Sequence, residues 1–179
     1  MRNYIIHAWS FVDPIYDKIR NFSTIETEDN VSVFRVQLIR YRGENQLLSD
    51  GNLIEKGDYL VKIHLHNVKL LKYLQAFHHT RKTIKLYQIV KKALPQLALF
   101  IKNHPLSKQI KAICGVTMLT KLVERLGFEV RPISNKIYRL SKCFSQFPIH
   151  YLSTGTFRGL LEKRVNYLFM SKNKLFEFS

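Results

Sequence analysis

Two histidines, His64 and His66, close a stretch with the alternating pattern of a β-strand, "GDYLVKIHLHN" (57–67). Alternate side chains of a strand point to the same face, so both imidazoles would lie on one side, ~6.6 Å apart along the strand. Such a pair could bind one zinc ion, border a ligand pocket together with Asn67, or line the rim of a sheet.

The zinc interpretation is the least favoured of the three. A zinc site needs a third ligand, whereas Lys62 places a cation on the same face, and only Asp50 and Asp58 could help across nearby turns. We therefore expect no metal, no cofactor and no assignable catalytic residue. The candidate ligand-binding residues are His64, His66 and Asn67, at a strand end where a pocket can open.

Other residues that could do chemistry have simpler interpretations. Cys114, followed by Gly115, could be a nucleophile at a strand-to-helix turn, but we favour two buried, reduced thiols at Cys114 and Cys143. The stretch "GTFRG" (155–159) lacks the pattern of a phosphate-binding loop. Ser171 is most simply a helix cap.

The elements that must position these residues change character along the chain. The first half predicts a helix over 4–20, a loop over 24–30 and a strand, "VSVFRVQLIRYRG" (31–43), that ends at Gly43. Turns at Asp50-Gly51 and Gly57-Asp58 indicate an antiparallel meander.

After Asn67 the hydrophobic period changes from two to 3.6, which predicts a short helix and then a long amphipathic one over 80–103. One side of the long helix is apolar: Leu86, Tyr87, Val90, Ala93, Leu94, Leu97, Phe100 and Ile101. The other side is cationic, and Pro95 falls there, so we expect one bent helix or two abutting helices.

The last third returns to strands. Thr117 can open a helix, and Gly127 supplies the left-handed residue that ends it, with Phe128 folding back. "FEVRPI" predicts a strand that stops at Pro132, a helix follows over 135–147, and "RVNYLFM" predicts a last strand. We therefore expect a single α+β domain over 1–179, in which late strands complete the sheet.

Charge is distributed unevenly. Residues 1–58 hold 7 Lys/Arg and 9 Asp/Glu, residues 59–179 hold 22 and 4, and no acidic residue lies between Asp58 and Glu124. A one-sided positive potential favours an anionic partner. The candidate contact residues on the long helix are Arg81, Lys82, Lys85, Lys91 and Lys92.

Three stretches resemble the YkoP-like family of bacterial proteins: "LSDGNLIEKGDYLVKIHLHN" (48–67), "GVTMLTKLVERLGFEVRPI" (115–133) and "YLFMSKNKLFEF" (167–178). The resemblance implies work near cell-envelope carbohydrate, because similar domains are attached to polysaccharide-deacetylase modules. It supplies no catalytic residue to carry over.

Together these observations predict a non-catalytic, accessory domain that binds an anionic or carbohydrate-related ligand in an envelope-associated pathway. The partners would be an anionic polymer, a carbohydrate or a membrane surface. Nucleic-acid binding through the basic two-thirds of the chain is the second hypothesis, and an enzyme that uses the His64/His66 face is the third. We find no cleavable signal and no apolar run of about 20 residues. We therefore expect a cytoplasmic protein that could associate peripherally with the inner face of the membrane.

Overall fold

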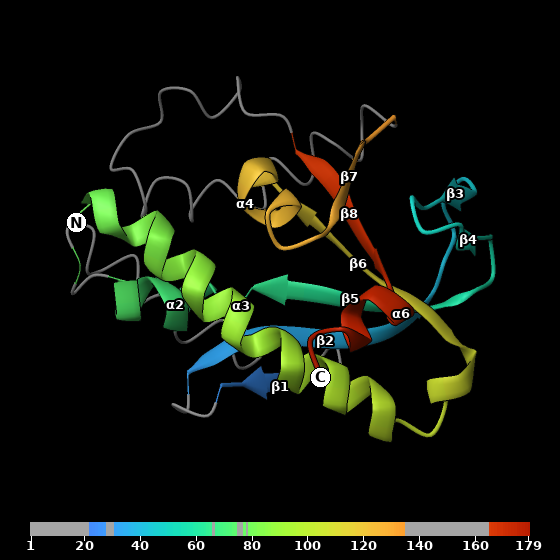
Figure 1. The fold of residues 1–179 in the computed structure, drawn as a ribbon, viewed down its shortest axis with the longest axis horizontal. Helices are drawn as coiled ribbons and strands as arrows, with labels where there is room; N and C mark the ends of the chain where they lie inside the picture. The colour runs from blue at the N-terminus through green and yellow to red at the C-terminus, as the bar shows by residue number, and fades with distance from the viewer. Residues whose placement is uncertain (1–21, 28–30, 66, 75–76, 78, 135–164) are drawn as a thin grey trace.

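A six-stranded mixed sheet forms the centre of the computed structural model, which describes residues 22–27, 31–65, 67–74, 77, 79–134 and 165–179 (Figure 1). The strand order is β1-β2-β5-β6-β8-β7. The strands are β1 Ser23–Glu26, β2 Ser32–Arg40, β5 Tyr59–Leu65, β6 Ile110–Thr117, β7 Glu129–Pro132 and β8 Asn166–Ser171. This arrangement confirms the predicted α+β class.

The first three strands of the sheet form the predicted antiparallel meander, since β2 pairs with both β1 and β5. Between β2 and β5 the chain makes a short hairpin, β3 Gln46–Leu47 and β4 Leu53–Ile54, which is a two-stranded sheet of its own. Gly51 and Gly57 have φ of 81° and 100° at the two predicted turns. Both turns therefore use the left-handed region that glycine enters without cost.

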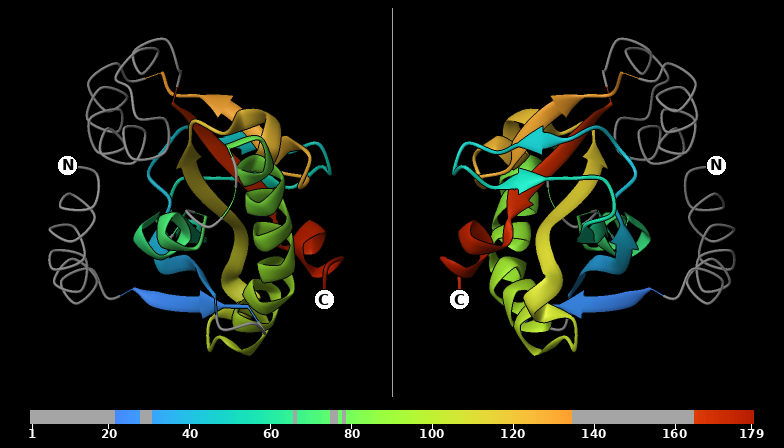
Figure 2. Two further views of the ribbon diagram at one scale, coloured as in Figure 1. Left: turned by 90° about the vertical axis from the view of Figure 1, so that its left-hand side faces the viewer. Right: turned by 90° about the vertical axis from the view of Figure 1, so that its right-hand side faces the viewer.

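A helical crossover joins β5 to β6, and these two strands are parallel. It contains α2 Asn67–Leu74 and α3 His79–Asn103, and the short 3-10 helix Ser107–Gln109 precedes β6. The long helix α3 is continuous through Pro95, so of the two expected arrangements, one bent helix or two abutting helices, the structure has one helix. Figure 2 shows α3 on one side of the sheet in both views.

Each face of the sheet carries a hydrophobic core. The larger one lies under α3, where Ala93, Leu94 and Leu97 of the predicted apolar side have no exposed surface. The smaller one lies on the opposite face and is closed by the hairpin through Leu48 and Ile54. Strand β5 serves both, because Val61 and Ile63 belong to the first core while Leu60 belongs to the second.

The helix that precedes β7, α4 Thr120–Glu124, ends as the sequence predicted. Gly127 has a φ of 87°, its N–H donates to the carbonyl of Glu124, and the N–H of Phe128 donates to the carbonyl of Val123. These two bonds are the Schellman motif that a left-handed glycine allows. The final strand β8 then pairs with β6 and β7, and α6 Lys172–Phe176 follows it.

Four details correct the predictions. Residues 24–26 belong to β1 and not to a loop, because Ile25 is buried and pairs with Phe34. The sequence patterns did not predict strand β6. Thr117 ends β6, so α4 begins three residues later than expected. The strand predicted to end at Gly43 ends at Arg40.

The helices predicted over 4–20 and 135–147 lie outside the described residues. In the described parts of the chain, no helix combines the length and apolarity needed to cross a bilayer.

Candidate functional site

Of the predicted ligand-binding residues, only His64 has a described side chain. It lies on β5, half-buried, on the face away from α3, and its ring meets the ring of Phe22 edge-on at 5.3 Å. His66 falls outside the described residues, and Asn67 is the first residue of α2. The described residues include no group of three His, Cys, Asp or Glu that could hold a metal ion. A pocket bordered by this pair therefore stays a prediction.

Of the five candidate cationic residues of α3, three are exposed and two are half-buried. Arg81, Lys91 and Lys92 are exposed, whereas Lys82 and Lys85 are half-buried. The ammonium of Lys85 lies 5.5 Å from the centre of the Phe77 ring, a cation–π distance.

Cys114 is a structural thiol. It lies in the middle of β6 with only 7% of its surface exposed, and burial raises its pKa to about 12, although the charge of Lys62 acts in the opposite direction. The nucleophile interpretation is therefore wrong, because a protonated, covered sulfur cannot attack a substrate. Cys143 and the 155–159 stretch lie outside the described residues.

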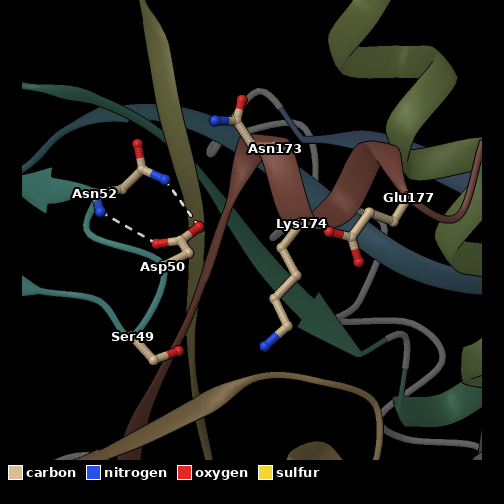
Figure 3. Close-up of a pocket in the computed structure, with 6 residues that line it drawn as sticks. All are labelled: Ser49, Asp50, Asn52, Asn173, Lys174 and Glu177. Carbon is tan, nitrogen blue, oxygen red and sulfur yellow. Dashed lines mark hydrogen bonds between the residues drawn. The ribbon is translucent and has the colours of Figure 1, made fainter.

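A hollow that the sequence did not predict lies between the loop of the hairpin and α6 (Figure 3). Its volume is about 310 Å³. Three polar side chains come from the hairpin loop and three from α6 and its C-cap residue, Glu177: Ser49, Asp50, Asn52, Asn173, Lys174 and Glu177.

Hydrogen bonds fix the hairpin loop. The N–H of Gly51 donates to the carbonyl of Leu48 (3.0 Å), and the N–H of Leu48 donates to the carbonyl of Asn52 (2.9 Å). Asn52 also donates to both oxygens of the Asp50 carboxylate, at 3.2 Å from its backbone and 2.8 Å from its amide. The loop therefore holds its two most polar side chains in one orientation.

Ser171 joins this loop to α6. Its hydroxyl oxygen accepts the N–H of Lys174 at 3.1 Å, which confirms the predicted helix cap. The same hydroxyl also lies near the carboxylate of Asp50. Burial acts to raise the pKa of Asp50, but the Ser171 hydroxyl and the hydrogen bonds from Asn52 outweigh it and hold that pKa below its ordinary value.

Glu129 of β7 anchors the loop from a third direction. One of its oxygens accepts both the N–H and the hydroxyl of Ser49, each at 2.7 Å. Its other oxygen accepts Arg131 at 2.8 Å, and Arg131 also donates to the carbonyl of Leu47 at 3.2 Å. The loop thus rests on strand β7 as well as on β8.

Lys174 reaches the hollow across Gly127. A side chain added at Gly127 would place its Cβ 3.1 Å from Cε of Lys174. The left-handed glycine that ends α4 thus also leaves room for the lysine stem. The three stretches that carry the family resemblance contribute the loop, the Gly127–Arg131 segment and α6, and all three meet here.

The lining can donate and accept hydrogen bonds in many directions, because it combines amides, a hydroxyl, carboxylates and an ammonium. Asp50 and Glu177 against Lys174 give it a formal charge of −1. The sequence missed this site because "SDGN" is typical of any tight turn and "SKNK" of any helix start. Only their contact in space distinguishes them.

Comparison with known proteins identifies the family. The model of the YkoP domain matches residues 2–179. The chain is also 46% identical over 176 residues to the "Uncharacterized protein YkoP" of Bacillus subtilis (strain 168). These 176 aligned residues cover 98% of this chain and 96% of that protein. No solved structure matches.

Proposed function

The chain belongs to the YkoP domain family, and we propose that it is a non-catalytic binding domain whose ligand is a neutral, polyhydroxylated molecule, carbohydrate in class. The proposed site is the hollow between the hairpin loop and α6. The observation that carries the proposal is the lining itself: six polar side chains from two elements around one hollow, with the loop half held in place by its own hydrogen bonds.

Charge argues for a neutral ligand. The formal charge of the lining is −1 in a protein whose net charge is +16. A phosphate or carboxylate would meet Asp50 and Glu177, whereas hydroxyl groups can donate to carboxylates and accept from amide and ammonium groups. Of the two ligand classes expected from the sequence, the hollow favours the carbohydrate.

The volume of the hollow and the order of its loop determine the expected affinity for a sugar. A volume of about 310 Å³ stands at the lower end of small-molecule pockets, which begin at about 300 Å³, so we expect one sugar unit to occupy it. Because Ser171, Asn52 and Glu129 already order the loop, little conformational entropy is lost on binding. Weak but specific binding, near the millimolar range for one unit, is the expected result.

The resemblance described above implies that related domains work beside polysaccharide-deacetylase modules, which is consistent with a carbohydrate ligand. We therefore propose a role in an envelope-associated pathway. The two other hypotheses from the sequence, nucleic-acid binding and an enzyme that uses the His64/His66 face, gain no support from the contacts of the described residues.

A titration followed by amide chemical shifts tests the proposal. The probes are a neutral N-acetylglucosamine tetramer and a glucose tetramer, added to the isotope-labelled full chain. We expect saturable shifts confined to residues 49–52 and 171–177 with at least one probe. Glu177→Gln and Asn173→Ala should weaken binding at least threefold, and Glu124→Gln, an exposed carboxylate on α4, should leave it unchanged.

Two outcomes would contradict the proposal. One is the absence of saturable shifts in the hollow with either probe. The other is an equal loss in Glu177→Gln and Glu124→Gln, because a specific site would distinguish the two carboxylates.

A further inference from the structure

We propose that the protein docks on the surface of a bilayer that contains anionic phospholipid, through the outer face of α3. Counted at 100° per residue, the side of α3 opposite the buried side spans roughly 120° of arc and carries five cationic and two large exposed aliphatic side chains. They define the outer face: Arg81, Ile84, Lys85, Lys91, Lys92, Leu99 and Lys102. This surface is separate from the hollow, and the inference does not depend on the proposed ligand.

The outer face is cationic over its whole length. It carries five positive charges on a 25-residue helix, about 37 Å long, and α3 contains no acidic residue. In the part of the chain that the structure describes, Arg81, Lys91 and Lys102 form no ion pair. Their charge is therefore available to anionic headgroups, which attract cations held within a Debye length of the surface.

Two large apolar side chains interrupt the cations. Ile84 is 58% exposed and Leu99 is 48% exposed, although α3 buries its other aliphatic side chains or packs them against the core. They lie 15 residues apart, about 22 Å along the helix. Apolar groups between cations suit the boundary between headgroups and acyl chains.

Helix α3 is already folded before it docks on a membrane. Its inner side packs on the sheet, with Ala93, Leu94, Leu97, Ala98 and Ile101 fully buried. The outer face can therefore lie along a membrane without refolding, and docking loses little conformational entropy.

The same residues favour a bilayer over nucleic acid. Proteins that hold single strands place aromatic rings among their cations for the bases to stack on. The exposed apolar residues of the outer face are aliphatic, and the aromatic residues Tyr87 and Phe100 of α3 pack against the core instead. The ring that Lys85 meets belongs to Phe77, which precedes α3 and is half-buried.

Vesicle co-sedimentation of the full chain tests this inference. The vesicles contain phosphatidylcholine with 30% phosphatidylglycerol, or phosphatidylcholine alone, across a salt series. The test variant replaces four outer-face cations by glutamine, Arg81, Lys85, Lys91 and Lys102. The matched control makes the same change at four exposed cations outside α3, namely Arg42, Lys56, Lys121 and Arg125. Both variants have the same net charge.

We expect the wild type to bind the anionic vesicles and not the neutral ones. Each cation contributes about 1 kcal/mol near such a surface, so the outer-face variant should bind at least tenfold more weakly, while the control stays within about threefold. Ile84→Ser with Leu99→Ser, which leaves the charge unchanged, should also weaken vesicle binding but not retention on heparin or duplex DNA. Unfolding midpoints check that each variant remains folded.

The inference is overturned if both quadruple variants lose binding equally, because net charge alone would then explain the attraction. It is also overturned if the double serine variant binds vesicles as the wild type does, because the aliphatic residues would then contact no lipid. Binding to duplex DNA that exceeds binding to anionic vesicles, and that the outer-face variant abolishes, would assign the surface to nucleic acid instead.

Discussion

Gly127 has two roles in the structure, and substituting it can separate them. Its φ of 87° closes α4, and the space above its Cα is occupied by the stem of Lys174. A side chain in the left-handed region costs ~1–2 kcal/mol. The added Cβ would also lie 3.1 Å from Cε of Lys174, but that atom is near the end of a flexible side chain and can move. We therefore expect Gly127→Ala to reduce the free energy of unfolding by ~1–2 kcal/mol, mostly through the backbone.

Urea and thermal unfolding measure this loss. For a chain of this size, ~1–2 kcal/mol corresponds to a midpoint decrease of roughly 2–8 °C. Gly127→Asn should lose less, because asparagine tolerates the left-handed region, and Gly127→Val should lose more, because a branched Cβ fits it worst.

The matched control is Gly51→Ala, since Gly51 has a similar φ of 81° and nothing lies within 4 Å of an added Cβ. The difference between the two alanine variants isolates the contact with Lys174, which we expect to be under ~0.5 kcal/mol. If Gly127→Ala unfolds at the wild-type midpoint, the left-handed helix end is not needed, and the reasoning about this residue is wrong.

Three further predictions concern single side chains. In a Cys143→Ser background, Cys114 should resist an aromatic disulfide reagent at pH 8 until the protein is unfolded, because a pKa of about 12 keeps the buried sulfur protonated; rapid labelling of the native protein would contradict this. Ser171→Ala should lower the free energy of unfolding by ~1 kcal/mol, because the helix cap of α6 is lost, and Ser171→Thr should recover part of that loss. Burial acts to raise the pKa of Asp58, but the Glu55 N–H and Lys111 together lower it. The ionised carboxylate therefore stabilises the fold above the ordinary carboxyl pKa, and this stabilisation is lost as the pH falls through the folded pKa. Asp58→Asn should reduce the free energy of unfolding more at pH 7 than at pH 3, and an equal reduction at both would refute the prediction.

Local patterns predicted those parts of the fold that depend on local causes. The helical period placed Ala93, Leu94 and Leu97 in the core, and the glycine after Leu126 marked a helix end that the structure confirms. The sequence patterns did not predict strand β6. Both faces of the sheet are covered there, so its short apolar stretch lacks the alternation of polar and apolar residues that indicates a strand.

The candidate site could not be predicted in the same way. Asp50 and Asn52 lie more than a hundred residues from Asn173 and Glu177 in the sequence. They become neighbours only because β8 returns beside β6 and carries α6 past the hairpin. His64 and His66, in contrast, lie two residues apart, so their pairing on one face of a strand could be predicted from local spacing alone.

The strand order carries a consequence for how the chain acquires its structure. Among the described strands, β7 pairs with β8 alone, and β8 is made more than thirty residues later. On the ribosome, β7 therefore cannot form its pairing with β8 until β8 emerges and inserts between β6 and β7. The meander and its crossover can collapse earlier, so folding would proceed in two stages. A nascent chain arrested before residue 165 would lack the partner that β8 provides to both β6 and β7, and unpaired strand edges are the kind of surface that chaperones bind and that pairs wrongly with other chains.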